Sequence, residues 1–305
     1  MSAKAKILVG PSVMGPAPIA KLAKQGFEVV PNPYSRKYTR AELQELLVGV
    51  DGILAGLEPL DREVLAASRL KVISRVGSGL ANVDIPAAES LGIKVFSTPN
   101  GPTLAVAELV VGSLICLLRE IQIMNRDLHE GKWTKIVGLQ LAGKKIAVVG
   151  FGRIGRTVAG MLAGLGAEII AVDPFLKEGP PGIQVMDLDA AVRTADVITL
   201  HCSGEDRVLG PAEFRAMKKG AFVLNAARAG LLDEAALIEA LENGTVAGAW
   251  LDVFPQEPYK GKLSGMRQVL LTPHVASYTQ EGRIKMEMDA VDNLLAGFGI
   301  GPVPD

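Results

Sequence analysis

Short apolar segments alternate with longer segments of helical spacing along most of the chain, and this alternation is the strongest constraint on the fold. The short segments are rich in valine and isoleucine, as in Lys6–Gly10 and Lys145–Gly150, while Ala41–Leu47 is one of the helical stretches. Such a pattern is typical of parallel sheets built from strand–helix–strand units. The sequence therefore predicts an α/β protein.

The alternation forms two series, separated by the proline- and glycine-rich segment Thr98–Thr103. Strands are expected first at Lys6–Gly10, Phe27–Val30, Gly52–Gly56, Lys71–Arg75 and Lys94–Thr98, then at Lys145–Gly150, Glu168–Asp173, Val197–Cys202, Ala221–Ala226, Val246–Val253 and Val269–His274. The six strands of the second series fit a doubly wound dinucleotide-binding domain. Thr279–Phe298 is predicted to be a helix that returns to the first domain. We therefore expect one domain over residues 1–99 and 280–305, and the dinucleotide-binding domain over residues 100–279.

Size and charge narrow the class of protein further. The 305 residues are enough for two domains at roughly 150 residues each. A formal net charge of −1 gives no electrostatic reason to expect a nucleic acid or a membrane surface as partner. The two cysteines, Cys116 and Cys202, lie in apolar runs, which argues against a disulfide framework or a metal site. Together with a start that does not resemble a signal peptide, they favour a reducing, cytoplasmic compartment.

A glycine-rich turn joins the first strand of the second series to a helix. Gly150, Gly152 and Gly155 stand in the spacing that permits a tight turn, close approach of a pyrophosphate and close packing of helix on strand. The phosphates would lie on the unpaired N–H groups at the helix N-terminus. Alone, this pattern fits ordinary turn chemistry equally well, but the strand before it and the helix after it favour dinucleotide binding.

An acidic residue follows at the distance that a dinucleotide site requires. Asp173 ends the next strand, 18 residues beyond Gly155, where a carboxylate can accept the hydroxyl protons of the adenosine ribose. The same carboxylate would repel a 2′-phosphate, and no arginine follows in Pro174–Leu176. We therefore expect NAD rather than NADP. The alternative is a solvated aspartate at a strand end.

Three residues suited to hydride-transfer chemistry follow the last three strands. Arg228, Glu257 and His274 are expected at one rim, because the carboxyl ends of parallel strands meet at the same edge of a sheet. A guanidinium can hold a carboxylate or a carbonyl oxygen through forked hydrogen bonds. An imidazolium can protonate that oxygen as hydride arrives at the carbon, and a nearby carboxylate stabilises the charged imidazolium.

Each of these residues also has an ordinary structural explanation: a surface ion pair for Arg228, a helix cap for Glu257 and a backbone contact for His274. The convergence of all three at one rim favours catalysis. The chain has only three histidines. His129 lies among charges at a helix end, and His201 has no carboxylate at comparable spacing, so His274 is the candidate proton donor. Cys202, beside the expected cofactor, is interpreted as a small apolar residue of that site.

Several motifs, in order, resemble the NAD-dependent D-isomer-specific 2-hydroxyacid dehydrogenases. They are Arg75–Gly79 with Asn82–Asp84, Ala107–Leu109, Gly131–Trp133, Gly150–Gly155 and the three strand-end motifs, and the match runs from about Gly52 to Ala296. The resemblance implies a flavodoxin-like substrate-binding domain, a Rossmann domain and a homodimer formed through the helix after Thr103. It also implies that Arg228 binds and polarises the substrate, that His274 donates the proton and that Glu257 pairs with His274.

The resemblance also carries over to binding residues. Positions that match the family's cofactor contacts are Ser78, Arg153, Ile154, Asp173, Ala226 and Asp252, and the backbone of Gly77, Ser78 and Gly79 matches the loop that receives the substrate carboxylate. Arg75 is either an anion ligand or a support for that loop. The overall likeness is to phosphoglycerate dehydrogenases, yet no arginine stands near Leu54–Leu57, where members that act on phosphorylated substrates often have one.

The expected function is thus the interconversion of a small anionic 2-oxo acid and its D-2-hydroxy acid with NAD, as in 3-phosphoglycerate dehydrogenase. An activity of the glyoxylate or hydroxypyruvate reductase type is the first alternative. A second is a non-enzymatic NAD-sensing protein, because transcriptional corepressors resemble this family. Formate dehydrogenases are a third alternative. Members of that group resemble one another in pairing the histidine with a glutamine, so the glutamate at position 257 argues against this alternative.

Overall fold

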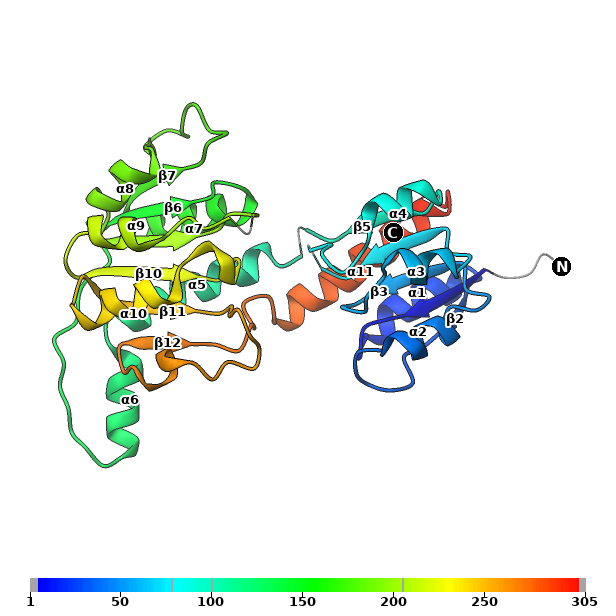
Figure 1. Cartoon of the computed structure of the whole chain (residues 1–305), viewed down its shortest axis with the longest axis horizontal. Coiled ribbons are helices and arrows are strands. Elements are labelled where there is room, and N and C mark those ends of the chain that lie inside the picture. Colours follow the sequence, from blue (N-terminus) through cyan, green and yellow to red (C-terminus); the bar gives the residue numbers. More distant parts are fainter. Residues whose placement is uncertain (1–4, 78, 100, 205, 302–305) are drawn as a thin grey trace. The chain divides into compact units, whose positions relative to one another are not determined.

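The computed structural model describes residues 5–77, 79–99, 101–204 and 206–301. Their chain forms two compact units, one of residues 1–102 with 278–305 and the other of residues Thr103–Ser277 (Figure 1). These divisions lie a few residues from the expected ones. The first unit is therefore assembled from two separate stretches of sequence, while the second is continuous.

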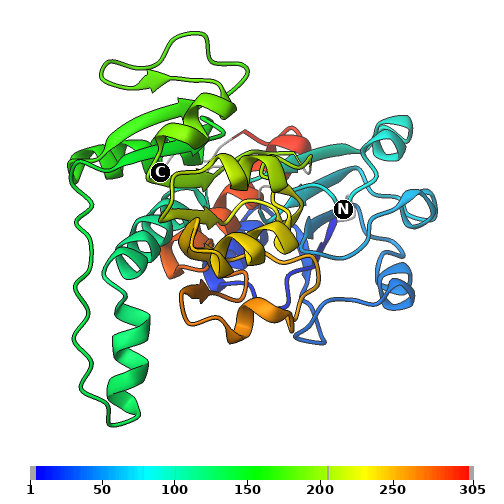
Figure 2. The ribbon, with the colours of Figure 1, turned by 60° about the vertical axis from the view of Figure 1, so that its left-hand side comes forward.

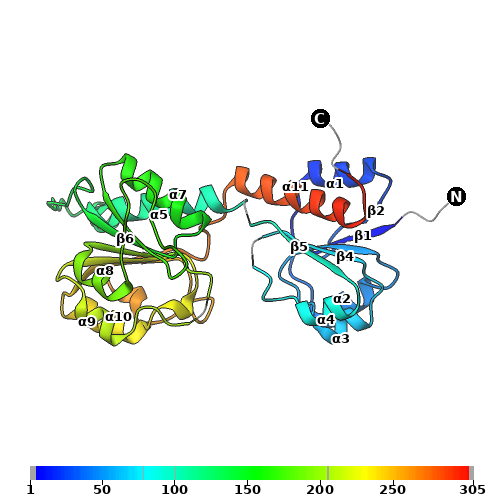
Figure 3. The same ribbon diagram turned by 90° about the horizontal axis from the view of Figure 1, so that it is seen from above.

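The first unit is built on a five-stranded parallel sheet. Its strands are β1 (Lys6–Val9), β2 (Glu28–Val30), β3 (Gly52–Ala55), β4 (Val72–Arg75) and β5 (Lys94–Ser97), in the order β2-β1-β3-β4-β5. This is the flavodoxin-like strand order. One face carries α1 (Pro16–Lys24) and α11 (Gln280–Gly297), and the other carries α2 (Arg40–Leu46), α3 (Arg62–Ala66) and α4 (Ile85–Ser90) (Figure 3).

The last helix of the chain completes the core of the first unit. Its buried residues Ala290, Val291, Leu294 and Leu295 pack with apolar side chains of β1, β3, β4 and α1. The hydroxyl of Ser74 in β4 donates to the carbonyl of Ala290 at 2.7 Å. An apolar stripe at helical spacing thus docks α11 on the sheet.

The second unit is a larger, doubly wound parallel sheet. Its strands are β6 (Lys145–Val149), β7 (Glu168–Val172), β8 (Gln184–Val185), β9 (Val197–Leu200), β10 (Ala221–Asn225), β11 (Val246–Leu251) and β12 (Val269–Leu271), in the order β12-β11-β10-β9-β6-β7-β8. Strand order reverses beside β6, which is the topological switch point where ligands bind in open α/β sheets.

Helices cover both faces of this second sheet. One face carries α5 (Thr103–Leu118) and α7 (Arg153–Gly164), and the other carries α8 (Leu188–Thr194), α9 (Pro211–Ala216) and α10 (Glu234–Glu242) (Figure 3). Two 3₁₀ turns, η1 (Ala229–Leu231) and η2 (Lys262–Gly265), lie in the loops. Each face of the sheet has its own buried apolar cluster, one around Trp250 and the other around Leu237.

The sequence predicts six strands for this sheet, and the structure has seven. The additional strand, β8, has only two residues and pairs with Ile170 and Ala171 at the sheet edge. It follows the turn-rich segment 179–182. Two residues are too few to show the alternation from which strands are recognised.

An arm projects from the second unit. It consists of α6 (Ile121–His129) and the extended segment 132–140 beside it (Figures 1 and 2). Asp127 is the buried residue of α6 and is paired with Arg267. Leu128, Trp133 and Val137 expose more than half of their surface. Among the described residues, no helix combines the length and apolarity that crossing a bilayer requires.

Candidate active site

The glycine turn after β6 has the packing expected of a dinucleotide loop. Gly150 has φ +93°, and a Cβ there would lie 2.6 Å from the backbone of His201 and Cys202. A Cβ on Gly155 would overlap the carbonyl oxygen of Gly150, so helix α7 can approach the turn only with glycine at that position. Gly152 has open space on its Cβ side. Two of the glycines are therefore required by the fold, and the third leaves room for a ligand.

The N-terminus of α7 is suited to an anion. Gly152 is the N-cap residue, and no side chain caps the helix, so its first N–H groups remain available as donors. Arg153 is exposed on the first turn, and Ile154 packs on the apolar cluster beneath it. The residues present thus fit a dinucleotide pyrophosphate.

Asp173 is held beside this turn by its own backbone neighbours. One carboxylate oxygen accepts from the N–H of Phe151 at 2.8 Å, and the other accepts from the N–H of Phe175 at 2.9 Å. Each oxygen keeps a free lone pair for a ribose hydroxyl. The ribose-binding role expected of Asp173 stays a prediction.

His201, Cys202 and Ala226 lie at neighbouring strand ends, where the cofactor is expected. Burial lowers the pKa of His201 to about 4, and its Nε2 lies 2.9 Å from the Thr199 hydroxyl. A histidine that is neutral at pH 7 is a poor proton donor. Burial raises the pKa of the Cys202 thiol, which packs as an apolar side chain against the buried cluster around Leu237. Ala226 is partly buried and packs on the opposite cluster.

The candidate acid and its carboxylate partner meet in the structure. Nδ1 of His274 lies 3.1 Å from both carboxylate oxygens of Glu257. His274 follows β12 and Glu257 follows β11, which is the adjacent strand. Because Nδ1 faces the carboxylate, Nε2 is left for proton transfer. The side chain of His274 is 58% exposed, so a small molecule can reach it.

A buried carboxylate fixes the backbone that carries His274. Asp252 is fully buried and accepts from the Thr272 hydroxyl at 2.5 Å and from the N–H groups of Val275 and Ala276 at 2.9 Å. His274 itself adopts a left-handed φ of 54°, which is unusual outside glycine. These three hydrogen bonds hold the chain on both sides of that residue. Asp252 therefore positions the histidine through the backbone.

Arg228 follows β10, which lies beside β11 in the sheet, and its side chain is exposed. One of its guanidinium nitrogens donates to the carbonyl of Ala227 at 2.7 Å. The side chain of Asn225, at the end of β10, donates to the Arg228 carbonyl and accepts from the Ala227 N–H. This small network fixes the backbone and leaves most of the guanidinium donors free for a substrate oxygen.

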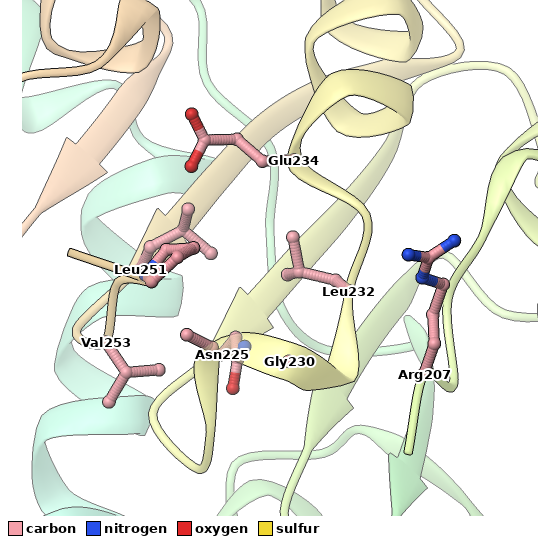
Figure 4. Close-up of a pocket in the computed structure, with 9 residues that line it drawn as sticks. Arg207, Asn225, Gly230, Leu232, Glu234, Leu251 and Val253 are labelled. Carbon is pink, nitrogen blue, oxygen red and sulfur yellow. The ribbon is translucent and has the colours of Figure 1, made fainter. Parts of the chain in front are cut away.

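A pocket of about 180 Å³ lies beside the turn that follows Arg228 (Figure 4). Its lining consists of Arg207, Asn225, Ala229, Gly230, Leu232, Glu234, Leu251, Val253 and Pro255. Arg207 is paired with Asp233 at 3.0 Å, and Glu234 accepts from the Tyr259 hydroxyl at 2.7 Å. Its charged groups already have partners, so the pocket is interpreted as space behind the Arg228 loop.

The expected carboxylate loop follows β4 in the first unit. Gly77 has φ +139°, and its N–H donates to the hydroxyl of Thr98 at 2.7 Å. That N–H is therefore not free for a substrate, while Gly79 lies in the open loop beyond. Ser78 lies outside the described residues. Arg75 is half-buried and packs directly against Gly77, and a Cβ on Gly77 would overlap its guanidinium.

Sequence reasoning missed Glu58 in the first unit. Its side chain is 1% exposed, and one oxygen accepts from the N–H of Gly56 at 2.7 Å. Burial raises the pKa of this carboxyl, and the charge of Arg75 opposes that rise. A lone glutamate in a loop gives no sequence signal of burial. Its position two residues after a strand-end glycine was the only available indication.

Among the described residues, no group of three or more His, Cys, Asp or Glu side chains is placed to hold a metal ion. The architecture and the site together define a two-unit α/β protein with a glycine turn of the dinucleotide-binding type, an aspartate beside that turn and a histidine–carboxylate pair at one sheet edge.

Comparison with known proteins identifies the family. Residues 111–276 match the model of the D-isomer specific 2-hydroxyacid dehydrogenase NAD binding domain. The chain belongs to this family, and its second unit is the NAD-binding domain. The resemblance inferred from the sequence motifs is thereby confirmed.

Individual relatives differ in how much of their length the chain covers. It is 37% identical to the D-3-phosphoglycerate dehydrogenase of Archaeoglobus fulgidus over 77% of this chain and 47% of that protein. It is 33% identical to the hydroxypyruvate reductase of Thermotoga maritima over 87% of this chain and 90% of that protein. The chain thus spans about half the length of the phosphoglycerate dehydrogenase.

A solved structure is similar over the whole chain. The NADPH-dependent glyoxylate/hydroxypyruvate reductase of Sinorhizobium meliloti superposes with a TM-score of 0.87 and 30% identity, covering 99% of this chain and 98% of that one. Relatives of this fold therefore include an enzyme that uses the phosphorylated cofactor.

The close contact between α7 and the glycine turn generates a test. Gly155→Ala is expected to lower the free energy of unfolding by about 1–3 kcal/mol, because a Cβ there overlaps the Gly150 carbonyl. Gly160→Ala in the same helix is the matched control, since that position has open space, and it is expected to add about 0.5–1 kcal/mol. Denaturant unfolding measures both. Equal effects of the two variants would contradict the packing role of Gly155.

Proposed function

We propose that the chain is an NAD-dependent oxidoreductase that interconverts a small 2-oxo acid and its D-2-hydroxy acid. The observation that carries this proposal is the pairing of His274 Nδ1 with both oxygens of Glu257. Arg228 follows β10, the strand beside the one that precedes Glu257. A histidine held by a carboxylate and flanked by a guanidinium matches the needs of carbonyl reduction. Membership in the family supports it further.

Each residue of the set has a defined task in this proposal. Arg228 binds and polarises the substrate carbonyl through its free guanidinium donors. His274 donates a proton from Nε2 to the carbonyl oxygen, and Glu257 stabilises the imidazolium and fixes its orientation. The loop Gly77–Gly79, with Arg75 beneath it, receives the substrate carboxylate, although the Gly77 N–H is already bonded to Thr98. When bound, NADH supplies the hydride that reduces the carbonyl carbon.

We assign cofactor binding to the edge of the second sheet around β6. Gly150, Gly152 and Gly155 with the first turn of α7 would hold the pyrophosphate. Asp173 would hold the adenosine ribose. The remaining cofactor contacts proposed from the family pattern are Ser78, Arg153, Ile154, Cys202 and Ala226. Asp252, the last residue of that pattern, is fully buried and would act by holding the backbone at this edge.

The first expected outcome concerns the acid. His274→Ala is expected to lower kcat by about 10²- to 10⁴-fold, because the variant lacks the proton donor. NADH oxidation with a panel of 2-oxo acids, phosphorylated and unphosphorylated, measures this loss. NADH binding, followed by fluorescence, is expected to stay unchanged.

His129→Ala is the matched control, since that histidine is exposed at the end of α6 and is expected to leave kcat unchanged. A wild-type chain that binds NADH and turns over none of the acids would favour a cofactor-sensing binding protein. Full activity of His274→Ala would refute the role given to that residue.

The second expected outcome concerns cofactor choice. Asp173→Ala is expected to lower the preference for NADH over NADPH at least about tenfold, since a carboxylate beside the ribose repels a 2′-phosphate. The ratio of kcat/KM for the two cofactors is the measurement. Glu178→Ala, an exposed acid in the following loop, is the control. An unchanged ratio in Asp173→Ala would show that Asp173 does not contact the ribose.

We further infer that the chain forms a homodimer in the cytoplasm through α5 and the arm around α6. The support is the group of exposed apolar residues on the arm, Leu128, Trp133 and Val137, which are costly to leave in water.

Near-zero net charge gives no reason to expect a nucleic acid or membrane partner. Both cysteines are free thiols, as a reducing compartment allows, and cell fractionation tests the location.

The dimer generates its own expected outcome. Light scattering is expected to give twice the chain mass of 32.1 kDa, and Val137→Asp is expected to shift the protein towards the monomer. Val48→Asp places the same charge on an exposed valine of the first unit and should leave the mass unchanged. A monomeric wild type at micromolar concentration would overturn this inference.

A further inference from the structure

The loop between β11 and η2 carries Glu257 in a stretch that has little packing of its own. Residues 255–258 are all exposed, whereas Phe254 before them is buried and Tyr259 after them is partly buried. The pocket drawn in Figure 4 is lined by Val253 at the start of this loop, so the loop is not closely packed on that side. The position of Glu257 therefore depends on a few separate contacts at the two ends of the exposed stretch.

Two aromatic rings close the loop at these ends. The rings of Phe254 and Tyr259 stack with their centroids 4.5 Å apart and their planes at 28°. Phe254 also contacts the carboxylate, since its N–H donates to Oε1 of Glu257 at 3.3 Å. The same oxygen lies 3.1 Å from Nδ1 of His274. A continuous chain of contacts thus runs from the Tyr259 ring through Phe254 and Glu257 to the candidate proton donor.

The hydroxyl of Tyr259 is fixed by two hydrogen bonds. Burial raises the pKa of Tyr259 to about 12, so the hydroxyl keeps its proton at neutral pH. It donates to Oε1 of Glu234, the first residue of α10, at 2.7 Å. It also accepts from the N–H of Leu263 in η2 at 3.3 Å. Tyr259 therefore ties the loop to two neighbouring elements of the second unit.

The backbone next to Tyr259 is shaped around this side chain. Gly261 has a φ of −81° and an extended ψ, which any residue can adopt, yet a Cβ there would overlap the hydroxyl and ring of Tyr259. Gly265 in η2 has open space on its Cβ side. Glycine at position 261 thus makes room for the tyrosine rather than for a special backbone conformation.

We propose that Tyr259 is a positioning residue, which holds Glu257 beside His274 and so keeps the proton donor oriented. This rests on the proposed function, in which His274 gives its proton to the carbonyl oxygen and Glu257 fixes the orientation of the imidazole. Tyr259 acts through Phe254, by the ring stack and the Phe254 N–H. A small displacement of a catalytic acid slows the reaction strongly, so the contacts that support it affect the rate.

The kinetic test removes the parts of Tyr259 one at a time. Tyr259→Phe keeps the ring and loses the hydroxyl, and it is expected to lower kcat about 2- to 10-fold. Tyr259→Leu also loses the ring stack and is expected to lower kcat about 10- to 100-fold. KM for the 2-oxo acid and the Kd of NADH are expected to stay unchanged, since Arg228 and the glycine turn after β6 are untouched.

A second pair of variants displaces the ring without changing it. Gly261→Ala is expected to push Tyr259 aside and to lower kcat about 10-fold or more. Gly265→Ala is the matched control, because its methyl group meets open space, and it is expected to keep the kcat of the wild type. This pair keeps the proposal testable if Tyr259→Leu does not fold. Wild-type kcat in Gly261→Ala would count against the proposal.

A double variant separates positioning from a general loss of folded protein. Glu257→Gln removes the carboxylate through which Tyr259 is proposed to act. Adding Tyr259→Leu to it is expected to lower kcat no further, whereas a loss of folded protein would lower kcat by the same factor in both backgrounds. An undiminished effect of Tyr259→Leu in the Glu257→Gln background would contradict the positioning role.

A measurement without turnover separates this proposal from the proposed function. The chain has only three histidines, so NMR can follow the Cε1–H signals of His129, His201 and His274 separately, and His274→Ala identifies the relevant one. Tyr259→Leu and Gly261→Ala are expected to shift or broaden the His274 signal alone. A His274 signal that stays unchanged in both variants overturns the proposal. Absence of turnover in the wild type counts against the proposed function only.

Discussion

The contact between α7 and the turn after β6 is the constraint on which the second unit depends. Gly155 lies against the carbonyl of Gly150, and no residue with a Cβ fits at that distance. The contact sets α7 on the sheet, where Val158 and Leu162 reach the apolar cluster around Trp250. It also aims the uncapped helix N-terminus at the switch point of the sheet. Stability and cofactor affinity therefore share one geometric cause.

The proposed catalytic groups depend on a second feature, which is their position at the ends of strands. Arg228, Glu257 and His274 follow three adjacent strands, so the sheet itself spaces them. Asp252 strengthens this by holding the backbone on both sides of His274 with three hydrogen bonds. A fully buried acid thus supports the backbone of the exposed His274. Such support holds reactive side chains in place while they stay accessible.

Most of the fold could be predicted because its signals are periodic. Valine- and isoleucine-rich segments located eleven strands, and glycine spacing located the tight turn after β6. The two-residue β8 was not predicted because one period of two residues is too short to show an alternation. Glu58 escaped for a different reason: burial of a loop carboxylate follows from glycines far apart in sequence, Gly10 and Gly56, which only the folded chain brings together. The full burial of Asp252 could not be predicted either. The sequence pattern around a strand-end aspartate is the same whether its side chain faces solvent or bonds to backbone N–H groups.

The split composition of the first unit has a consequence for biosynthesis. Its core contains Leu294 and Leu295 of α11, which are made after the whole of the second unit. On the ribosome, the continuous second unit can therefore fold while the first five strands still lack one covering helix. During that interval Ile7, Leu54 and Val72 lack the cover that α11 gives them in the folded unit. Because synthesis runs from the N-terminus, the second unit can be completed before the first unit, although the first unit begins earlier in the sequence.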